Sequence, residues 1–273
     1  DGKAIIYNSD VSSFLNEEKD CSIDLAILDP PYWRVVNEKW DRQWKTEEDY
    51  ICWVRQWSSE LFQKMRYGGS VYLFGYFRTL SKLVSPLESI GYQLRQQIVL
   101  GKGLRAISGR ATKDYKIFPN VTESCLLLIK DPYPYVKQIL LDAKKANKFS
   151  SKEINEKIGV KSNGGGMWSI YTGKNICRQI PTKEIWDKFS DVFQLKIDYC
   201  KISQTFNPIK GLTDVWTDIN FYEEDRIHPT QKPLKLIKRL IQASSNEGDL
   251  IIDPFLGSSS SVIGSIDMGR EIH

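Results

Sequence analysis

Short apolar runs alternate along the chain with stretches in which apolar residues recur every three or four positions. Ile23–Leu28 is almost entirely apolar, which is typical of a strand buried on both faces of a parallel sheet, and Ser70–Tyr76 and Ser124–Lys130 have a similar strand character. Glu47–Met65 and Thr79–Ile90 have helical spacing. This βα alternation predicts a doubly wound α/β sheet with helices on both faces. The other elements expected are strands at Ala4–Tyr7, Gln93–Leu100 and Asp249–Ile252, helices at Ser12–Leu15 (capped at Asp10 or Ser12), Leu234–Ser244 and Ser258–Ile266, and a break at Gly68-Gly69.

The pattern changes between about Asp131 and Asn207. Lysines cluster there, the strand signal fades, Ser151–Ile158 resembles a short capped helix, and Thr182–Phe193 is an amphipathic helix. We therefore predict one catalytic domain, formed by residues 1–130 and 208–273, which carries a mostly helical insert at 131–207.

Bulk composition limits the function only weakly. The chain has 273 residues and a formal net charge of +4. It has no apolar run long enough for a membrane span and no basic leader before an apolar core, so the expected location is the cytoplasm. The five cysteines lie far apart and there are two histidines, which disfavours a disulfide framework or a structural zinc site.

Positive charge is concentrated in one glycine-containing segment, Gly101–Lys116. We interpret it as a flexible basic loop that contacts DNA phosphates, with an ordinary solvated surface loop as an equal alternative. The predicted DNA-binding residues are Lys102, Arg105, Arg110, Lys113 and Lys116.

The first candidate for chemistry is Asp29-Pro30-Pro31-Tyr32, at the carboxyl end of a predicted strand. Ligands bind at such strand ends in open α/β sheets. The two prolines fix the backbone, and a carboxylate beside outward-facing carbonyls can accept both hydrogens of an amino group. Tyr32 offers a face on which an extruded base can stack. A Pro-Pro turn that merely ends a strand is the structural alternative.

Two further motifs are each only a weak signal of a functional site when taken singly. Asp253-Pro254-Phe255-Leu256-Gly257-Ser258 follows another predicted strand, and its small residues let the backbone approach a ligand. It is neither a dinucleotide fingerprint nor a phosphate loop. His228-Pro229-Thr230-Gln231-Lys232-Pro233 precedes a predicted helix and could simply be a proline-flanked helix start.

Together the three motifs resemble the β-class amino-methyltransferases of bacterial DNA modification, which are permuted S-adenosylmethionine enzymes. In that class the catalytic motif precedes the target-recognition region and the cofactor motif follows it, which is the order found here. The resemblance covers nearly the whole chain. It implies a Rossmann-like methyltransferase sheet and S-adenosylmethionine as the cofactor.

The resemblance also implies roles for single residues. The catalytic residues would be Asp29, Pro30, Pro31 and Tyr32. The cofactor-binding residues would be Asp10, near the adenine, and Asp29, Thr230, Gln231, Lys232, Asp253, Phe255, Gly257 and Ser258, around the methionine portion. The family usually continues Gly-Arg-x-x-x-Gly-x-Glu, where the acid binds the ribose, whereas this sequence stops at His273, before that acid. The other departure is Ser259–Ser261, where many relatives have Gly-Thr.

The target base follows from the first residue of the catalytic motif. Relatives with aspartate there mostly methylate adenine N6, so Asp29 favours adenine, while Trp33 is more common among cytosine-N4 enzymes, which stay the alternative. The eukaryotic RNA adenine enzymes carry Asp-Pro-Pro-Trp, which disfavours RNA. No metal is expected, because the sulfonium is itself electrophilic. A non-catalytic nucleic-acid-binding protein and a nicotinamide oxidoreductase are the alternatives from other classes.

The partners implied are double-stranded DNA, a second copy of the chain and a cognate restriction endonuclease. The insert is expected to be the target-recognition subdomain, with a Gly164–Gly166 hinge and with Trp168 and Tyr171 exposed. Ser151–Ile158 followed by Gly159 resembles the start of a helix-turn-helix. A helical cap that stabilises the sheet or forms a dimer contact is the alternative. The lysines of the insert are Lys144, Lys145, Lys148, Lys152, Lys157 and Lys161.

Overall fold

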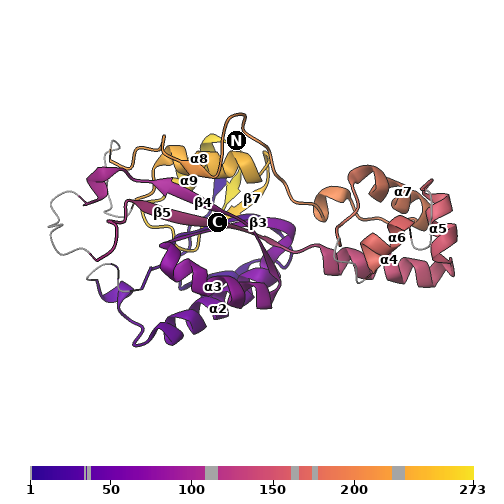
Figure 1. Cartoon of the computed structure of the whole chain (residues 1–273), viewed down its shortest axis with the longest axis horizontal. Helices are drawn as coiled ribbons and strands as arrows, with labels where there is room; N and C mark the ends of the chain where they lie inside the picture. Colours follow the sequence, from indigo (N-terminus) through magenta and orange to yellow (C-terminus); the bar gives the residue numbers. More distant parts are fainter. Residues whose placement is uncertain are drawn as a thin grey trace. The chain divides into compact units, whose positions relative to one another are not determined.

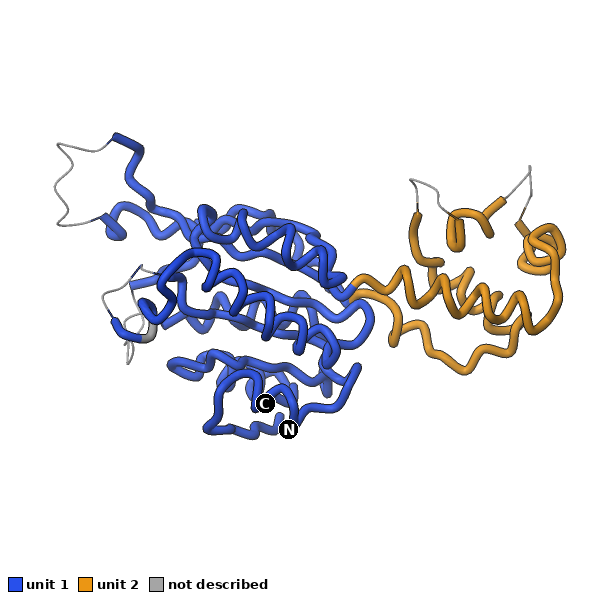
Figure 2. The backbone as a smooth tube through the Cα atoms, turned by 90° about the horizontal axis from the view of Figure 1, so that it is seen from below, with its two compact units in different colours: residues 1–130, 205–273 blue, residues 131–204 orange. Residues whose placement is uncertain are grey.

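The computed structural model describes residues 2–33, 35, 38–107, 116–160, 166–173, 178–222 and 231–273. The chain divides into two compact units, coloured separately in Figure 2. Unit 1 comprises Asp1–Lys130 and Thr205–His273, and unit 2 comprises Asp131–Gln204. None of the helices in the described part of the chain combines the length and the apolar character needed to cross a membrane.

Unit 1 is built on one sheet, to which eight of the described segments contribute in the order β1-β8-β7-β2-β3-β5-β4-β6. β2 pairs parallel with both of its neighbours, as its apolar sequence predicts, and β5 runs antiparallel to both of its own. The strands are β1 Lys3–Ala4, β2 Ile23–Leu28, β3 Met65–Gly75, β4 Tyr92–Gly101, β5 Thr122–Lys130, β6 Val215–Trp216, β7 Leu250–Ile252 and β8 Glu271–Ile272.

Three predicted boundaries in unit 1 are wrong. The break at Gly68-Gly69 lies inside β3, where the register with β2 shifts and Gly68 adopts a φ of 76°. Glycines can accommodate such an irregularity in pairing without ending the strand. The last helix begins at Ser260 rather than Ser258, because Ser259 is left-handed with a φ of 62°. The expected strand at Ala4–Tyr7 is reduced to β1.

Helices cover both faces of the sheet, as predicted (Figure 1). On one face, Trp57 and Leu61 of α2 and Leu80 of α3 pack against Val71 and Leu73 of β3. On the other face, the apolar side of α8 packs against strand residues whose side chains point to that face of the sheet. Each such buried side chain contributes about 1.5–3 kcal/mol. The helices of unit 1 are α1 Val11–Glu17, α2 Glu47–Lys64, α3 Phe77–Ile90, α8 Leu234–Ser244 and α9 Ser260–Asp267, with 3₁₀ turns η1 Lys39–Asp41 and η2 Leu104–Ile107.

Unit 2 is helical and has a hydrophobic core of its own. Trp168 and Tyr171, predicted to be exposed, are 4% and 1% exposed, and each packs edge-on against Phe189. That prediction is wrong because both aromatic residues lie on α6, whose apolar face α4 and α7 cover. Of the proposed hinge, Gly166 begins α6, and residues 164 and 165 lie outside the described residues. The helices are α4 Tyr133–Asn147, α5 Ser151–Lys157, α6 Gly166–Thr172 and α7 Lys183–Phe193.

Candidate active site

A cavity of about 520 Å³ lies at the carboxyl ends of β2 and β7. Asp29 follows the last residue of β2 and Asp253 follows the last residue of β7, and the two strands pair parallel. The sheet therefore brings into one cavity two motifs that lie more than 200 residues apart in the sequence. The cavity wall also includes Phe74, Tyr76, Lys102, Glu123, Gln231 and Lys232.

The loop after β2 is held in place from α2 and η1. The hydroxyl of Tyr50 on α2 donates a hydrogen bond to the Pro31 carbonyl at 2.9 Å. The Val35 backbone N–H donates to Asp41 Oδ2 at 2.5 Å. Trp33 stacks on Tyr50 with 6.5 Å between ring centroids, and it does not line the cavity. These contacts from α2 and η1 therefore fix the backbone of the loop that follows Asp29.

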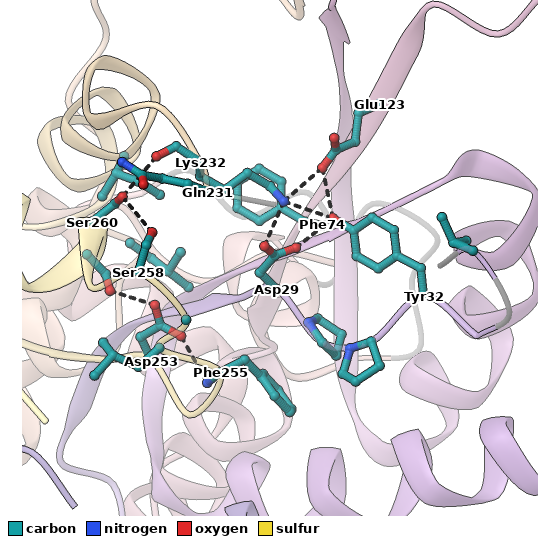
Figure 3. Close-up of a pocket in the computed structure, with 18 of the residues that line it drawn as sticks. Asp29, Tyr32, Phe74, Glu123, Gln231, Lys232, Asp253, Phe255, Ser258 and Ser260 are labelled. Carbon is teal, nitrogen blue, oxygen red and sulfur yellow. Dashed lines mark hydrogen bonds and ion pairs between the residues drawn. The ribbon is translucent and has the colours of Figure 1, made fainter. Parts of the chain in front are cut away.

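Four side chains form a connected polar network at one end of the cavity (Figure 3). The Lys232 ammonium lies 2.7 Å from Asp29 Oδ2, 3.1 Å from Glu123 Oε1 and 3.1 Å from the Tyr32 hydroxyl. The Tyr32 hydroxyl lies 2.6 Å from Asp29 Oδ1 and 2.8 Å from Glu123 Oε1. The second oxygen of Glu123 is ion-paired with Lys102. When Lys102 is counted with these four side chains, two carboxylates and two ammonium groups balance each other.

The charges of the network stabilise one another although they are buried. Burial alone would raise the pKa of Glu123, but Lys232, Lys102 and the hydrogen bonds to this carboxylate lower the pKa to about 2. Burial would lower the pKa of Lys232, whereas the carboxylates of Asp29 and Glu123 raise it above its ordinary value. The pKa of Tyr32 is raised by burial and by the same two carboxylates, so its hydroxyl keeps its proton.

Glu123 is the residue of this site that the sequence analysis missed. It is 2% exposed and lies near the start of β5, one residue before the strand that was predicted. Because β5 runs antiparallel to β3, the start of β5 reaches the sheet edge at which β2 ends. The signal that could have identified it is a lone acid directly preceding a strand that is otherwise mainly apolar.

The second motif occupies another part of the same cavity. Asp253 Oδ1 accepts a hydrogen bond from the Phe255 backbone N–H at 3.0 Å, and Oδ2 accepts one from the Ser261 hydroxyl at 2.6 Å. Burial, together with the negative charge of Asp29, raises the pKa of Asp253 to about 6 despite these bonds. Gly257 has a φ of 51°, a conformation that favours glycine.

Other predicted site residues are placed less directly. Asp10 caps α1 by accepting hydrogen bonds from the Ser12 and Ser13 backbones. It does not line the main cavity, but its neighbours Ser9 and Val11 line a smaller one of about 60 Å³ that Asp253 also borders. Gln231 and Ser258 line the main cavity. Thr230 lies outside the described residues.

The predicted basic loop is only partly described. Lys102 faces the cavity, where it pairs with Glu123, whereas Arg105 and Lys116 are exposed. Arg110 and Lys113 lie outside the described residues. Within the described part of this segment, Arg105 and Lys116 are therefore the basic side chains that present their charge to solvent.

The cavity fits S-adenosylmethionine, the cofactor that the motif resemblance implies. Its volume lies within the roughly 300–1,000 Å³ of small-molecule sites. The carboxylates of Asp29 and Asp253 in its wall complement a ligand that carries a sulfonium and an ammonium group. Phe255 supplies an apolar face, and Gly257 permits close approach of the backbone. Asp253, Phe255, Gly257 and Ser258 are the residues that would hold the methionine portion.

Comparison with known proteins points the same way. A family model described as DNA methylase matches residues 23–272. The DNA adenine methyltransferase YhdJ of Escherichia coli (strain K12) is 25% identical over 281 residues, which cover 99% of this chain and 77% of that protein.

Two solved structures share the fold. The M1.HpyAVI–SAM complex has a TM-score of 0.55 and 15% identity, and the match covers 98% of this chain and 91% of that one. The PvuII DNA methyltransferase, described as cytosine-N4-specific, has a TM-score of 0.60 and 12% identity, with 99% and 80% covered.

Proposed function

Because the chain belongs to the DNA methylase family of N6 and N4 amino-methyltransferases, which use S-adenosylmethionine, we propose that it methylates adenine at N6 in double-stranded DNA. The observation that carries this proposal is the meeting of Asp29 and Asp253 in one cavity. One acid is available to a base and the other to a cofactor. An enzyme that transfers a group from the cofactor to the base needs both acids in a single site.

The proposed chemistry centres on the carboxylate of Asp29. A target base enters the cavity by extrusion from the duplex. Asp29 accepts a hydrogen bond from the exocyclic amino group, and the Pro30 carbonyl accepts the other hydrogen, since Tyr50 already occupies the Pro31 carbonyl. This arrangement turns the nitrogen lone pair away from the acceptors. When bound, S-adenosylmethionine supplies the electrophilic methyl group. Asp29 then takes up the proton that the methylated nitrogen loses.

The choice of adenine rests on the aspartate at position 29 and on the likeness to an adenine enzyme. Cytosine N4 is the second candidate, supported by Trp33 after the motif and by the fold shared with a cytosine-N4 enzyme. Trp33 packs on Tyr50 and is not among the residues that line the cavity.

Incubation of the protein with cofactor and plasmid DNA, followed by nucleoside mass spectrometry, tests the proposal. We expect N6-methyladenine, and we expect Asp29→Ala to reduce its formation by roughly 10²–10⁴-fold. Asp20→Ala is the matched control, because Asp20 is exposed and pairs with Lys64 at 2.8 Å, away from the cavity wall. N4-methylcytosine as the product would overturn the adenine assignment, and near-normal turnover by Asp29→Ala would overturn the catalytic role.

We further propose that unit 2 recognises the target sequence. The support is its separate helical core and the exposed lysines Lys145 and Lys148 at the end of α4. α5 has a capping box at Ser150 and is followed by Gly159 with a φ of 72°. A separately folded unit can change its surface without disturbing the sheet that forms the cavity.

Exchange of residues 131–204 with the corresponding segment of a relative of different specificity tests this role. We expect the hybrid to bind cofactor and to methylate the site of the donor. A folded hybrid that still methylates the original sequence would show that recognition resides in unit 1. A second copy of the chain and a cognate endonuclease stay predictions as partners.

A further inference from the structure

Glu123 takes part in neither the catalytic nor the cofactor motif, yet it is the most completely buried acid of the cavity wall apart from Asp41. A buried carboxylate costs several kcal/mol unless ion pairs and hydrogen bonds compensate for it. Here Lys232, Lys102 and Tyr32 supply that compensation. Two of these groups, Lys232 and Tyr32, also contact Asp29, which suggests a role beyond stability.

The hydrogens of Lys232 and the Tyr32 hydroxyl are fewer than the contacts that these groups make in the network. The Lys232 ammonium has three hydrogens and three acceptors within 3.1 Å, namely Asp29, Glu123 and the Tyr32 oxygen. The Tyr32 hydroxyl has one hydrogen but two carboxylate oxygens, at 2.6 Å and 2.8 Å. At any instant one of these two contacts therefore lacks a hydrogen.

Both oxygens of Asp29 are engaged in this state, Oδ2 by Lys232 and Oδ1 by Tyr32. The amino group of a base therefore competes with one of these partners for an oxygen of Asp29. Tyr32 is the partner that can leave without loss, because Glu123 already lies within hydrogen-bond distance of the same hydroxyl. A rotation about the C–O bond redirects the hydroxyl hydrogen of Tyr32 from Asp29 to Glu123. The hydrogen stays on the Tyr32 oxygen, and the ring stays in place.

We propose that Glu123 is a positioning residue of the methyltransferase site. It holds Lys232 and takes over the Tyr32 hydroxyl when Asp29 Oδ1 turns to the target amino group. This role rests on the proposed function, since it requires an amino group as the substrate. Lys102, on the other oxygen of Glu123, keeps that carboxylate ionised and oriented.

Glu123→Gln is a sharp perturbation of this arrangement. A lysine ammonium lies at each oxygen of Glu123, so the amide nitrogen of glutamine faces an ammonium group in either orientation. We expect the single-turnover rate of methyl transfer to fall about 10–100-fold, the factor for loss of one hydrogen bond to a charged group. The Kd for S-adenosylmethionine, measured by calorimetry, should change less than about threefold, because the methionine-binding residues are untouched.

Two further variants separate positioning from a structural role. Asp218→Asn is the control, since Asp218 lies in an ion pair with Arg239 outside the cavity. Tyr32→Phe removes the shared hydroxyl, so Glu123→Gln should slow the reaction less in that background than in the wild type. If Glu123→Gln does not bind cofactor, the double variant Lys102→Met/Glu123→Gln is compared with Lys102→Met alone. In this background the Lys102 ammonium no longer faces the amide of the glutamine.

The outcomes are distinct. A wild-type protein that methylates DNA, with a slow Glu123→Gln variant and a smaller effect in the Tyr32→Phe background, supports the role. Equal rates for Glu123→Gln and Asp218→Asn, or the same factor with and without the Tyr32 hydroxyl, overturn it while the proposed function stands. A wild-type protein that binds cofactor but transfers no methyl group to DNA overturns both.

Discussion

Replacing Asp253 with asparagine changes one atom of a buried carboxylate that forms no ion pair with any basic side chain in the described part of the chain. Its hydrogen-bond partners are the Phe255 backbone N–H and the Ser261 hydroxyl. Asparagine can keep both, because its oxygen accepts from Phe255 and its amide donates to the Ser261 oxygen. The substitution therefore removes the charge with little change in packing.

The magnitude follows from the pKa of Asp253, which burial raises from 3.8 to about 6. At about 1.36 kcal/mol per pH unit, the ionised carboxylate costs the folded protein roughly 3 kcal/mol. A raised pKa means that the folded protein holds this proton more tightly than the unfolded chain does. Stability is thus lost as the pH rises from about 4 to about 6, and the full cost is present at pH 7.5.

Thermal unfolding of the cofactor-free protein between pH 4.5 and pH 7.5 measures this effect. We expect Asp253→Asn to raise the Tm of unit 1 by several degrees at pH 7.5 and to lose this advantage toward pH 4.5. We also expect it to weaken S-adenosylmethionine binding about 10–100-fold, because a cationic ligand loses its buried counter-charge.

Asp218→Asn is the matched control, for which the expected change in Tm at pH 7.5 has the opposite sign. Hydrogen bonds and charge from Arg239 and Lys235 lower the pKa of Asp218, so loss of its charge should lower the Tm at pH 7.5. If Asp253→Asn were no more stable than the wild type at pH 7.5, or if its effect did not vary with pH, the inferred cost of burying this carboxylate would be refuted.

Three other predictions concern the rest of the molecule. Lys232→Met should slow methyl transfer at least about 100-fold, because two carboxylates then face each other without their shared cation, and single-turnover kinetics measure the loss. Combined Arg105→Ala and Lys116→Ala should reduce the salt dependence of DNA binding by a slope of about one per lost phosphate contact, and an unchanged slope would make this segment ordinary surface. Trp168→Ala should destabilise unit 2 by about 3–5 kcal/mol, seen as faster amide exchange in α4 and α7, with cofactor binding retained.

Much of the fold was predictable because it is encoded locally. The uninterrupted apolar run Ile23–Leu28 has the same bounds as β2, and Asp10 caps α1 as expected. Thr182 caps α7, whose inward residues follow the predicted spacing. Strand burial and helix capping depend on residues a few positions apart, so one sequence is enough to reveal them. The order of the three motifs, which indicated the family, is likewise a property of the sequence alone.

The partners across the cavity were decided only by the tertiary structure. Lys232 lies 203 positions from Asp29 in the sequence, and Glu123 lies 91 positions from Tyr32, yet all four side chains meet. Their meeting requires β5 to run antiparallel to β3, because a parallel β5 would carry Glu123 to the opposite edge of the sheet. The burial of Trp168 similarly depends on α4 and α7. Local patterns specify each element, whereas strand direction and packing specify which distant side chains share a site.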